Sequence, residues 1–344
     1  MKSGRLIWII LCAVILAAAI VFIVVRPSAP KPPEPPVDLD WNAQLHPENV
    51  WAVYWDIAAA KEIPSLSQNL KSVSLFSCLY DSFDNVFIPD KLRDLKDLIR
   101  EVYDGSLYLS FVNDISYPDG TSSEKNTDLL DRLLASEEEM NNRTDEFLEL
   151  AEKWECQGVE LDFEKVRDVD QWRRYARLIE LLWEKSREKE MSVRIILPLS
   201  VPVNEVVLPS GPDYVVMCYN LFGNHSGPGP KADKEFLTGV AEKFGDIPNI
   251  GFALANGGFE WNSSGRVNRS IKSVNARNLA LESKSSEMRD EKSGTLVFRY
   301  RQKDSRDYNT IWYADAVTLA YWRSILEEKM GHAVEISMWR MESK

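Results

Sequence analysis

Three carboxylate residues alternate with apolar residues near the middle of the chain, at Glu160, Asp162 and Glu164. This alternation predicts a β-strand with one acidic and one apolar face. An acidic face is costly to bury in an ordinary sheet unless its charges are paired or protonated, so it belongs in a barrel lumen or on the floor of a cleft. Carboxylates crowded there raise one another's pKa values, and one of them can then donate a proton near neutral pH, as hydrolysis of a glycosidic bond requires. A solvated edge strand is the other interpretation of this spacing.

The segment from Gln157 to Glu164 resembles the signature of glycoside hydrolase family 18, the chitinase family, whose pattern is D-G-x-D-x-D-x-E. Gln157 stands at the first Asp of that pattern and Glu160 at the second, whereas Asp162 and Glu164 match it. The resemblance implies that Glu164 is the catalytic acid and base, and that Asp162 hydrogen-bonds it and assists it. The alternation along a strand puts Glu160 deepest, paired or partly protonated, and we count it among the substrate-binding residues.

Three further segments resemble landmarks of the same family and follow in the family's order. They are residues 213–220, like the sixth strand with its terminal Met-x-Tyr-Asp; residues 311–316, like the Trp-(Tyr/Phe)-x-Asp segment; and residues 335–340, like the eighth strand. The resemblance implies that Tyr219 is catalytic and binds the substrate's acetamide oxygen, with Met217 and Asn220 lining the substrate site beside it. It implies that Trp339 stacks beneath the sugar ring. Taken alone, Tyr219 or Trp339 is more simply interpreted as a packing residue.

The likeness is to a short bacterial branch resembling spore-germination and cortex-lytic N-acetylglucosaminidases. The implied function is cleavage of β-1,4 bonds in a glycan that contains N-acetylglucosamine, either peptidoglycan or a chitin-like polymer. The implied mechanism needs no cofactor, retains the anomeric configuration and uses the substrate's own acetamido group. The alternative is a catalytically weak or inactive barrel that binds glycans or serves the cell envelope. Lectin-like members of the family usually lose the terminal Glu of the pattern, so Glu164 favours the enzyme.

Strand-like and helical segments alternate through the rest of the chain, which predicts a (β/α)8 barrel, the TIM-barrel fold. The strands are expected at 50–55, 73–79, 106–112, 159–164, 192–197, 214–219, 249–254 and 334–339. The helices are expected at 91–102, 127–134, 137–154, 169–189, 234–244 and 314–329. The polar stretch 261–309 is interpreted as a loop insertion between the seventh and eighth strands, with a short β-element at 295–301. Because Glu164, Tyr219 and Trp339 end their strands, they are expected to meet at the barrel mouth.

The first residues of the chain read as a membrane anchor. Leu6–Val25 is an apolar run of 20 residues, preceded by Lys2 and Arg5, which is long enough to span a bilayer with its N-terminus in the cytosol. A cleaved signal peptide, and hence a secreted form, is the alternative. Six prolines within 27–36 predict an extended spacer. The expected organisation is a signal anchor at 1–26, a Pro-rich linker at 27–47, and a catalytic barrel at 48–344 outside the cytoplasm.

Composition limits the remaining possibilities. A formal charge of −12 argues against nucleic acid as a partner. His46, His225 and His332 are isolated in the sequence, so no histidine-based metal site is expected. The four cysteines give no disulfide framework, and those beyond the apolar run are interpreted as free buried thiols: Cys78, Cys156 and Cys218.

Overall fold

The computed structural model describes residues 44–66, 68–302 and 307–343. The anchor expected at 1–26 and the linker up to residue 43 lie outside these residues. Within the described ranges, no helix combines the length and the apolar character needed to cross a bilayer.

Eight parallel strands form a closed barrel in the order β2-β1-β15-β9-β8-β7-β6-β4, and pairing of β2 with β4 closes it. The strands are β1 (Asn49–Val53), β2 (Ser72–Tyr80), β4 (Ser106–Ser116), β6 (Gly158–Asp162), β7 (Ser192–Leu197), β8 (Asp213–Met217), β9 (Ile250–Ala255) and β15 (Ile336–Trp339). Two short strands, β3 (Val86–Phe87) and β5 (Ser122–Ser123), pair antiparallel with β2 and β4. The predicted TIM barrel is confirmed, and each expected strand overlaps an observed one.

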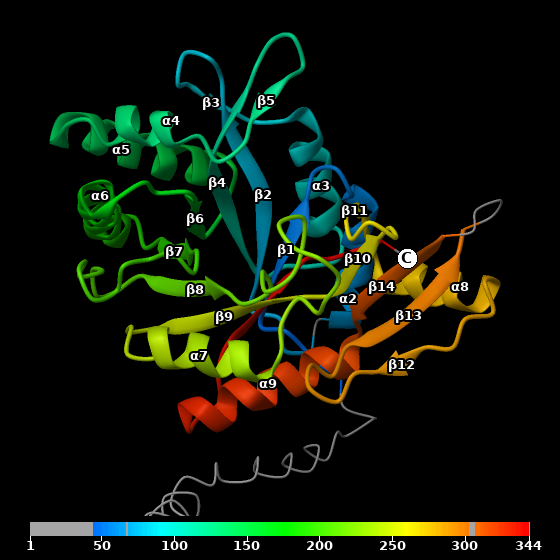
Figure 1. Ribbon diagram of the computed structural model, residues 1–344. Helices are drawn as coiled ribbons and strands as arrows, with labels where there is room; N and C mark the ends of the chain where they lie inside the picture. The colour runs from blue at the N-terminus through cyan, green and yellow to red at the C-terminus, as the bar shows by residue number, and fades with distance from the viewer. Residues whose placement is uncertain (1–43, 67, 303–306, 344) are drawn as a thin grey trace, which may run out of the picture. The chain divides into compact units, whose positions relative to one another are not determined.

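Helices cover the outside of the barrel close to their predicted positions. They are α3 (Asp90–Arg100), α4 (Thr127–Leu133), α5 (Glu137–Lys153), α6 (Val169–Glu188), α7 (Lys234–Phe244) and α9 (Ala316–Met330). All but α3 begin after a side chain that accepts a backbone N–H bond from the first turn, namely Asn126, Ser136, Asp168, Asp233 and Asp315. Such caps satisfy N–H groups that have no partner within the helix. Figure 1 shows α4, α5 and α6 on one flank of the barrel.

Among the described residues, two connections of the barrel lack a full helix, and no helix was expected in either of them. Between β1 and β2 the chain forms only the 3-10 helix η1 (Ile57–Glu62) and the single turn α2 (Ile63–Leu66). Between β7 and β8, residues 198–212 form turns and no helix. This connection contains four prolines, at positions 198, 202, 209 and 212, and proline lacks the N–H that a helix interior needs.

The insertion before α9 is a folded sheet and not the loop we expected. Its elements are β10 (Gly257–Trp261), β11 (Val267–Ile271), α8 (Ser273–Glu282), β12 (Met288–Arg289), β13 (Leu296–Arg301) and β14 (Tyr308–Ala314). The strands are antiparallel in the order β11-β10-β14-β13-β12, and β13 coincides with the β-element expected at 295–301. Figure 1 shows this sheet with α8 beside the barrel.

The insertion sheet has a small apolar core of its own, formed by Ile271, Ala276, Ala280, Phe298, Ile311 and Tyr313. Its strands carry many exposed polar residues, so the sequence reads as a loop. Strand β10 approaches β14 so closely that a Cβ atom on Gly258 would lie 1.8 Å from the Trp312 carbonyl oxygen. Only glycine fits there.

The barrel core contains the three cysteines in the described ranges. Cys78, Cys156 and Cys218 are buried and free, which confirms the interpretation of these residues as unpaired thiols.

Candidate active site

A cavity of about 230 Å³ opens at the carboxyl ends of the barrel strands. All but one of the predicted site residues line it, and the lining is Phe76, Val112, Asn113, Asp114, Lys125, Asp162, Glu164, Met217, Tyr219, Asn220 and Trp339. Residues from β2, β4, β6, β8 and β15 thus converge on one space. A larger cavity of about 400 Å³ lies at the amino ends of the strands, the face of such barrels that serves stability and not chemistry.

Glu160 is the predicted site residue that does not line the cavity. Its side chain is fully buried below Asp162, and its carboxylate accepts hydrogen bonds from Trp51 Nε1 at 2.6 Å and Ser74 Oγ at 2.7 Å. The Arg194 guanidinium lies 3.4 Å from the same carboxylate and stacks on the Tyr108 ring. The pairing that we expected for Glu160 is observed. Glu160 does not line the cavity, so its expected contact with a substrate stays a prediction.

Asp162 is 9% exposed, and its Oδ1 atom is buried without a hydrogen-bond partner. Burial raises the pKa of this carboxyl well above its usual range, and the charges of Glu164 and Glu160 raise it further. The hydrogen bond that we expected between Asp162 and Glu164 is not among the contacts of the described residues. Asp162 is therefore a buried acid that favours its protonated form.

The backbone at Glu164 is fixed by one side chain from β4. Asn113 accepts a hydrogen bond from the Glu164 N–H at 2.9 Å and donates one to the Glu164 carbonyl at 2.9 Å. β6 ends at Asp162, so Glu164 lies in the turn after the strand and not within it as we expected. The Glu164 carboxylate forms an ion pair with Lys125, with 2.5 Å between Oε1 and Nζ.

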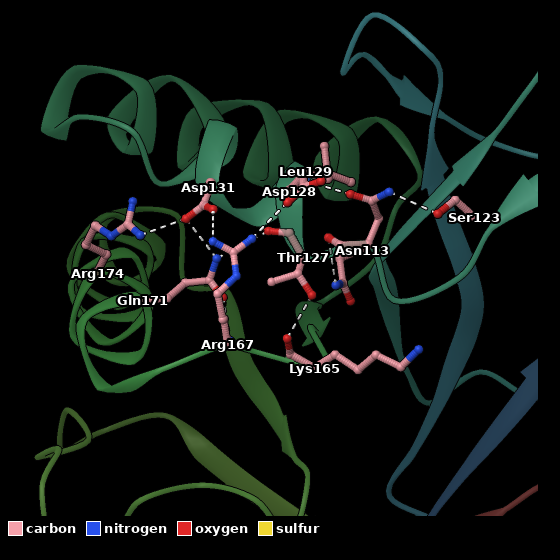
Figure 2. Close-up of polar contacts among 11 residues, drawn as sticks. Asn113, Ser123, Thr127, Asp128, Leu129, Asp131, Lys165, Arg167, Gln171 and Arg174 are labelled. Atoms are coloured by element: carbon pink, nitrogen blue, oxygen red, sulfur yellow. Dashed lines mark hydrogen bonds and ion pairs between the residues drawn. The ribbon is translucent and has the colours of Figure 1, made fainter.

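The turn that carries Glu164 is also attached to α4. Figure 2 shows Thr127 Oγ1 donating to the Lys165 carbonyl, and Arg167 bridging to Asp128 and Asp131. Asn113 lies beside these contacts in the same view. A catalytic group gains efficiency when its backbone cannot move, because orientation is then set before the substrate arrives.

Tyr219 and Trp339 form the other side of the cavity. Burial, followed by the charges of Asp162 and Glu164, raises the pKa of Tyr219 well above its usual value, so its hydroxyl keeps its proton and can donate a hydrogen bond. The Trp339 ring meets the rings of Phe76 and Trp51 edge to face, with centroids 4.9 and 5.8 Å away. These contacts fix the Trp339 ring at the cavity wall.

Our sequence reasoning missed Asn113, Asp114 and Lys125. We expected the third strand to end at residue 112, whereas β4 continues to Ser116 and brings the Asn-Asp pair to the cavity. A polar pair directly after an apolar strand was the available signal for these two residues. Burial raises the pKa of Asp114 although its Oδ1 accepts the Lys125 N–H at 2.7 Å. Nothing in the sequence around Lys125 predicts that it lines the site, because the β4–β5 hairpin brings it there.

Across the described residues, no group of three or more His, Cys, Asp and Glu side chains is arranged to hold a metal ion. The arrangement supplies instead a buried carboxyl with a raised pKa, a second carboxylate, a hydroxyl donor and an aromatic ring around one space. Together these groups can hold and protonate a polar ring-shaped substrate.

No family model matches this sequence, and no curated protein matches it. Solved structures do match it. The spore cortex-lytic enzyme SleL of Bacillus cereus is 16% identical with a TM-score of 0.70, and the match covers 87% of this chain and 71% of that one. A class V chitinase from Pseudomonas fluorescens Pf-5 is 15% identical with a TM-score of 0.70, over 86% and 95% of the two chains. A mutant class V chitinase from Nicotiana tobaccum in complex with NAG4 is 11% identical with a TM-score of 0.68, over 87% and 95%.

At these identities the likeness establishes a shared fold. The expected resemblance to chitinase-type and cortex-lytic barrels is confirmed at that level.

Proposed function

We propose that this protein is a glycoside hydrolase that cleaves β-1,4 bonds in glycans containing N-acetylglucosamine. The observation that carries this proposal is the convergence of Asp162, Glu164, Tyr219 and Trp339 on one cavity at the carboxyl ends of the strands. Barrel enzymes carry their active sites at this end. The names of the similar structures, cortex-lytic enzyme and chitinase, support the same substrate class. The complex of one of them with NAG4 supports N-acetylglucosamine units as the ligand.

The proposed reaction uses the substrate's acetamido group as its nucleophile. Glu164 protonates the leaving glycosidic oxygen while the acetamido oxygen attacks the anomeric carbon of the same sugar. Tyr219 donates a hydrogen bond that orients the acetamido group, and Asp162 as a carboxylate stabilises the positive charge of the cyclic intermediate. Trp339 stacks against the sugar ring. Water then opens the intermediate with Glu164 as the base, so the anomeric configuration is retained.

The test compares wild type with Glu164→Gln on purified peptidoglycan and on chitin oligomers, and measures the release of reducing ends. We expect release by the wild type, more from peptidoglycan than from chitin, and almost none by the variant. Cellulose, which lacks the acetamido group, should not be cleaved. Equal turnover by wild type and Glu164→Gln would overturn the assignment of Glu164. Labelling of Asp162 by a fluorosugar that traps a carboxylate nucleophile would overturn the mechanism.

A second candidate function is a glycan-binding barrel without turnover. The Lys125–Glu164 ion pair favours it, because the proposed acid is held in an ion pair with a cation. Calorimetry with a chitin oligomer separates the two candidates. Binding without any release of reducing ends over long incubation would establish the binding barrel, whereas turnover would exclude it.

We also propose that Leu6–Val25 anchors the chain in a membrane with the barrel outside the cytoplasm. The run has the length of a bilayer span, and Lys2 and Arg5 precede it. The full chain should remain in the membrane fraction after a high-salt wash, and external protease should release the barrel by cutting near the prolines of 27–36. A mature N-terminus downstream of Val25 would show a cleaved signal peptide instead.

A further inference from the structure

Lys125 is the one cationic side chain among the described residues that line the cavity. Its backbone is in the left-handed region, at φ 53°, which is uncommon for residues other than glycine. Its N–H donates to Asp114 Oδ1 at 2.7 Å, and the next residue, Asn126, donates its N–H to the Asn113 carbonyl at 2.7 Å. Asn113 is also the side chain that holds the backbone of Glu164. Asn113 and Asp114 therefore fix the backbone at Lys125, and Asn113 also fixes the backbone of the proposed acid.

The carboxylate below Asp162 has its own partners. Both oxygens of Glu160 accept hydrogen bonds, from Trp51 and Ser74, and Arg194 lies against one of them. Asp162 Oδ1 has no hydrogen bond. Glu160 is therefore not arranged to exchange a proton with Asp162, and the only other carboxylate next to it on this strand and its turn is Glu164.

We propose that Lys125 is a positioning residue that decides which carboxyl group holds the transferable proton. In the free enzyme Lys125 binds the Glu164 carboxylate, and we place the transferable proton on Asp162. This inference rests on the proposed function, since it assigns a proton that only glycosidic cleavage uses.

Substrate binding reverses this arrangement. Lys125 leaves Glu164, the proton passes from the Asp162 carboxyl to the Glu164 carboxylate, and Glu164 then gives it to the leaving glycosidic oxygen. Asp162 is left as the carboxylate that the positively charged intermediate requires, and Glu164 as the acid that the leaving oxygen requires. Release of the Lys125–Glu164 ion pair thus leaves the negative charge on Asp162 and the transferable proton on Glu164, as the reaction requires.

The charges around Asp162 agree with this assignment. Glu160 and Glu164 come from β6 and its turn, Asp114 from β4, Tyr219 from the segment after β8, Tyr175 from α6 and Lys125 from the segment before α4. Glu164, Glu160 and Asp114 favour protonation of Asp162, and Lys125 opposes it. Removing the ammonium therefore moves the proton-loss step to higher pH.

The kinetic test uses Lys125→Met, which keeps chain length without charge, and Lys125→Arg, which keeps the charge. In Lys125→Met we expect kcat/KM to fall about tenfold to hundredfold, because Glu164 is no longer oriented in the free enzyme before the substrate arrives. We expect the basic limb of the kcat/KM profile to rise by about one pH unit. Lys125→Arg should restore the profile. A loss of rate with an unmoved basic limb would overturn the proposal, because a merely structural lysine predicts that result.

The matched control is Lys185→Met, which breaks an ion pair of similar length with Asp145 between α6 and α5 (2.7 Å). It should leave both kcat/KM and the pH profile unchanged. A shift of the basic limb in this control as large as that in Lys125→Met would overturn the proposal, because any lost surface charge would then suffice.

A measurement without substrate separates this proposal from the proposed function. The infrared spectrum of the full-length protein at neutral pH is compared with the spectrum of each variant. The wild type should show a protonated carboxyl band that is absent in Asp162→Asn and present in Glu164→Gln. A band that disappears in Glu164→Gln alone, or no band at all, would overturn the proposal. Failure of the proposed function would appear instead as no turnover with the Asp162 band intact.

Discussion

The barrel mouth and the insertion sheet each bury a carboxylate, and the two carboxylates behave in opposite ways. Glu260 on β10 is 4% exposed and accepts hydrogen bonds from Tyr300 Oη, Asn309 Nδ2, Asn268 Nδ2 and Arg269 Nε. Burial acts to raise its pKa, but the bonds from Tyr300, Arg269 and Asn268 outweigh burial, so the pKa is lowered.

Asp162 is also largely shielded from solvent, at 9% exposed, but it lies deeper in the protein and has an oxygen without a donor and two acidic neighbours. The comparison teaches that burial alone does not make a proton donor. Donors make a buried carboxylate a permanent charge, and their absence makes it an acid that can be used. The predictions below test this contrast, from the largest expected effect to the smallest.

Glu164→Gln tests the barrel mouth directly. The substitution removes the transferable proton and little else, so kcat should fall by about 10²- to 10⁴-fold. Binding of a chitin oligomer, measured by calorimetry, should change little. A comparable loss of binding would mean that the amide disturbs the site and does not merely remove the acid.

Arg194→Met tests the floor of the barrel, where Glu160 is paired. The variant leaves a fully buried carboxylate without its cation, which should cost about 3–5 kcal/mol of folding free energy. Denaturant unfolding measures this loss. Lys71→Met, which removes an exposed lysine paired with Glu335, is the control and should cost less than about 1 kcal/mol. Equal losses of folding free energy in the two variants would show that the buried Arg194–Glu160 pair stabilises the fold no more than an exposed ion pair does.

Glu260→Gln tests the insertion sheet. The amide cannot accept from all four donors, so unfolding should become easier by about 1–3 kcal/mol at neutral pH. Because folding lowers the pKa of Glu260, its stabilising effect is present above the unfolded pKa and is lost as the pH falls through the folded value. The difference between wild type and variant should therefore narrow on acidification. A difference independent of pH would attribute the effect to packing.

Asp162→Asn should raise the stability of the protein, whereas Arg194→Met and Glu260→Gln should lower it. Because folding raises the pKa of Asp162, the folded protein takes up a proton between the unfolded and folded values, and stability is lost as the pH rises through that window. A neutral amide avoids this loss, so the Tm at neutral pH should rise. Below the unfolded pKa the two proteins should unfold alike. A lower Tm at neutral pH would contradict the raised pKa.

The sequence by itself determined the barrel and the identity of the acidic strand. The strands were predictable because their apolar residues run on or alternate with period two, a local signal that burial imposes on each strand separately. The match of Asp162 and Glu164 to a known pattern pointed to the strand that we propose carries the chemistry, and the terminal residues of other strands pointed to the same end. Apart from β13, the strands of the insertion sheet escaped prediction because their polar residues carry no such signal.

Only the tertiary structure decided what each acidic residue does. Glu160 is paired by Trp51, Ser74 and Arg194, which come from three other strands. Lys125 reaches Glu164 through a hairpin and a clamp at Asn113. Sequence spacing does not distinguish the pKa values of Glu160, Asp162 and Glu164. A pKa depends on the charges and donors within a few ångströms and not on neighbours along the chain. Closure of the barrel brings those charges and donors together, and it divides one acidic face into a paired floor, a buried acid and a carboxylate held by lysine.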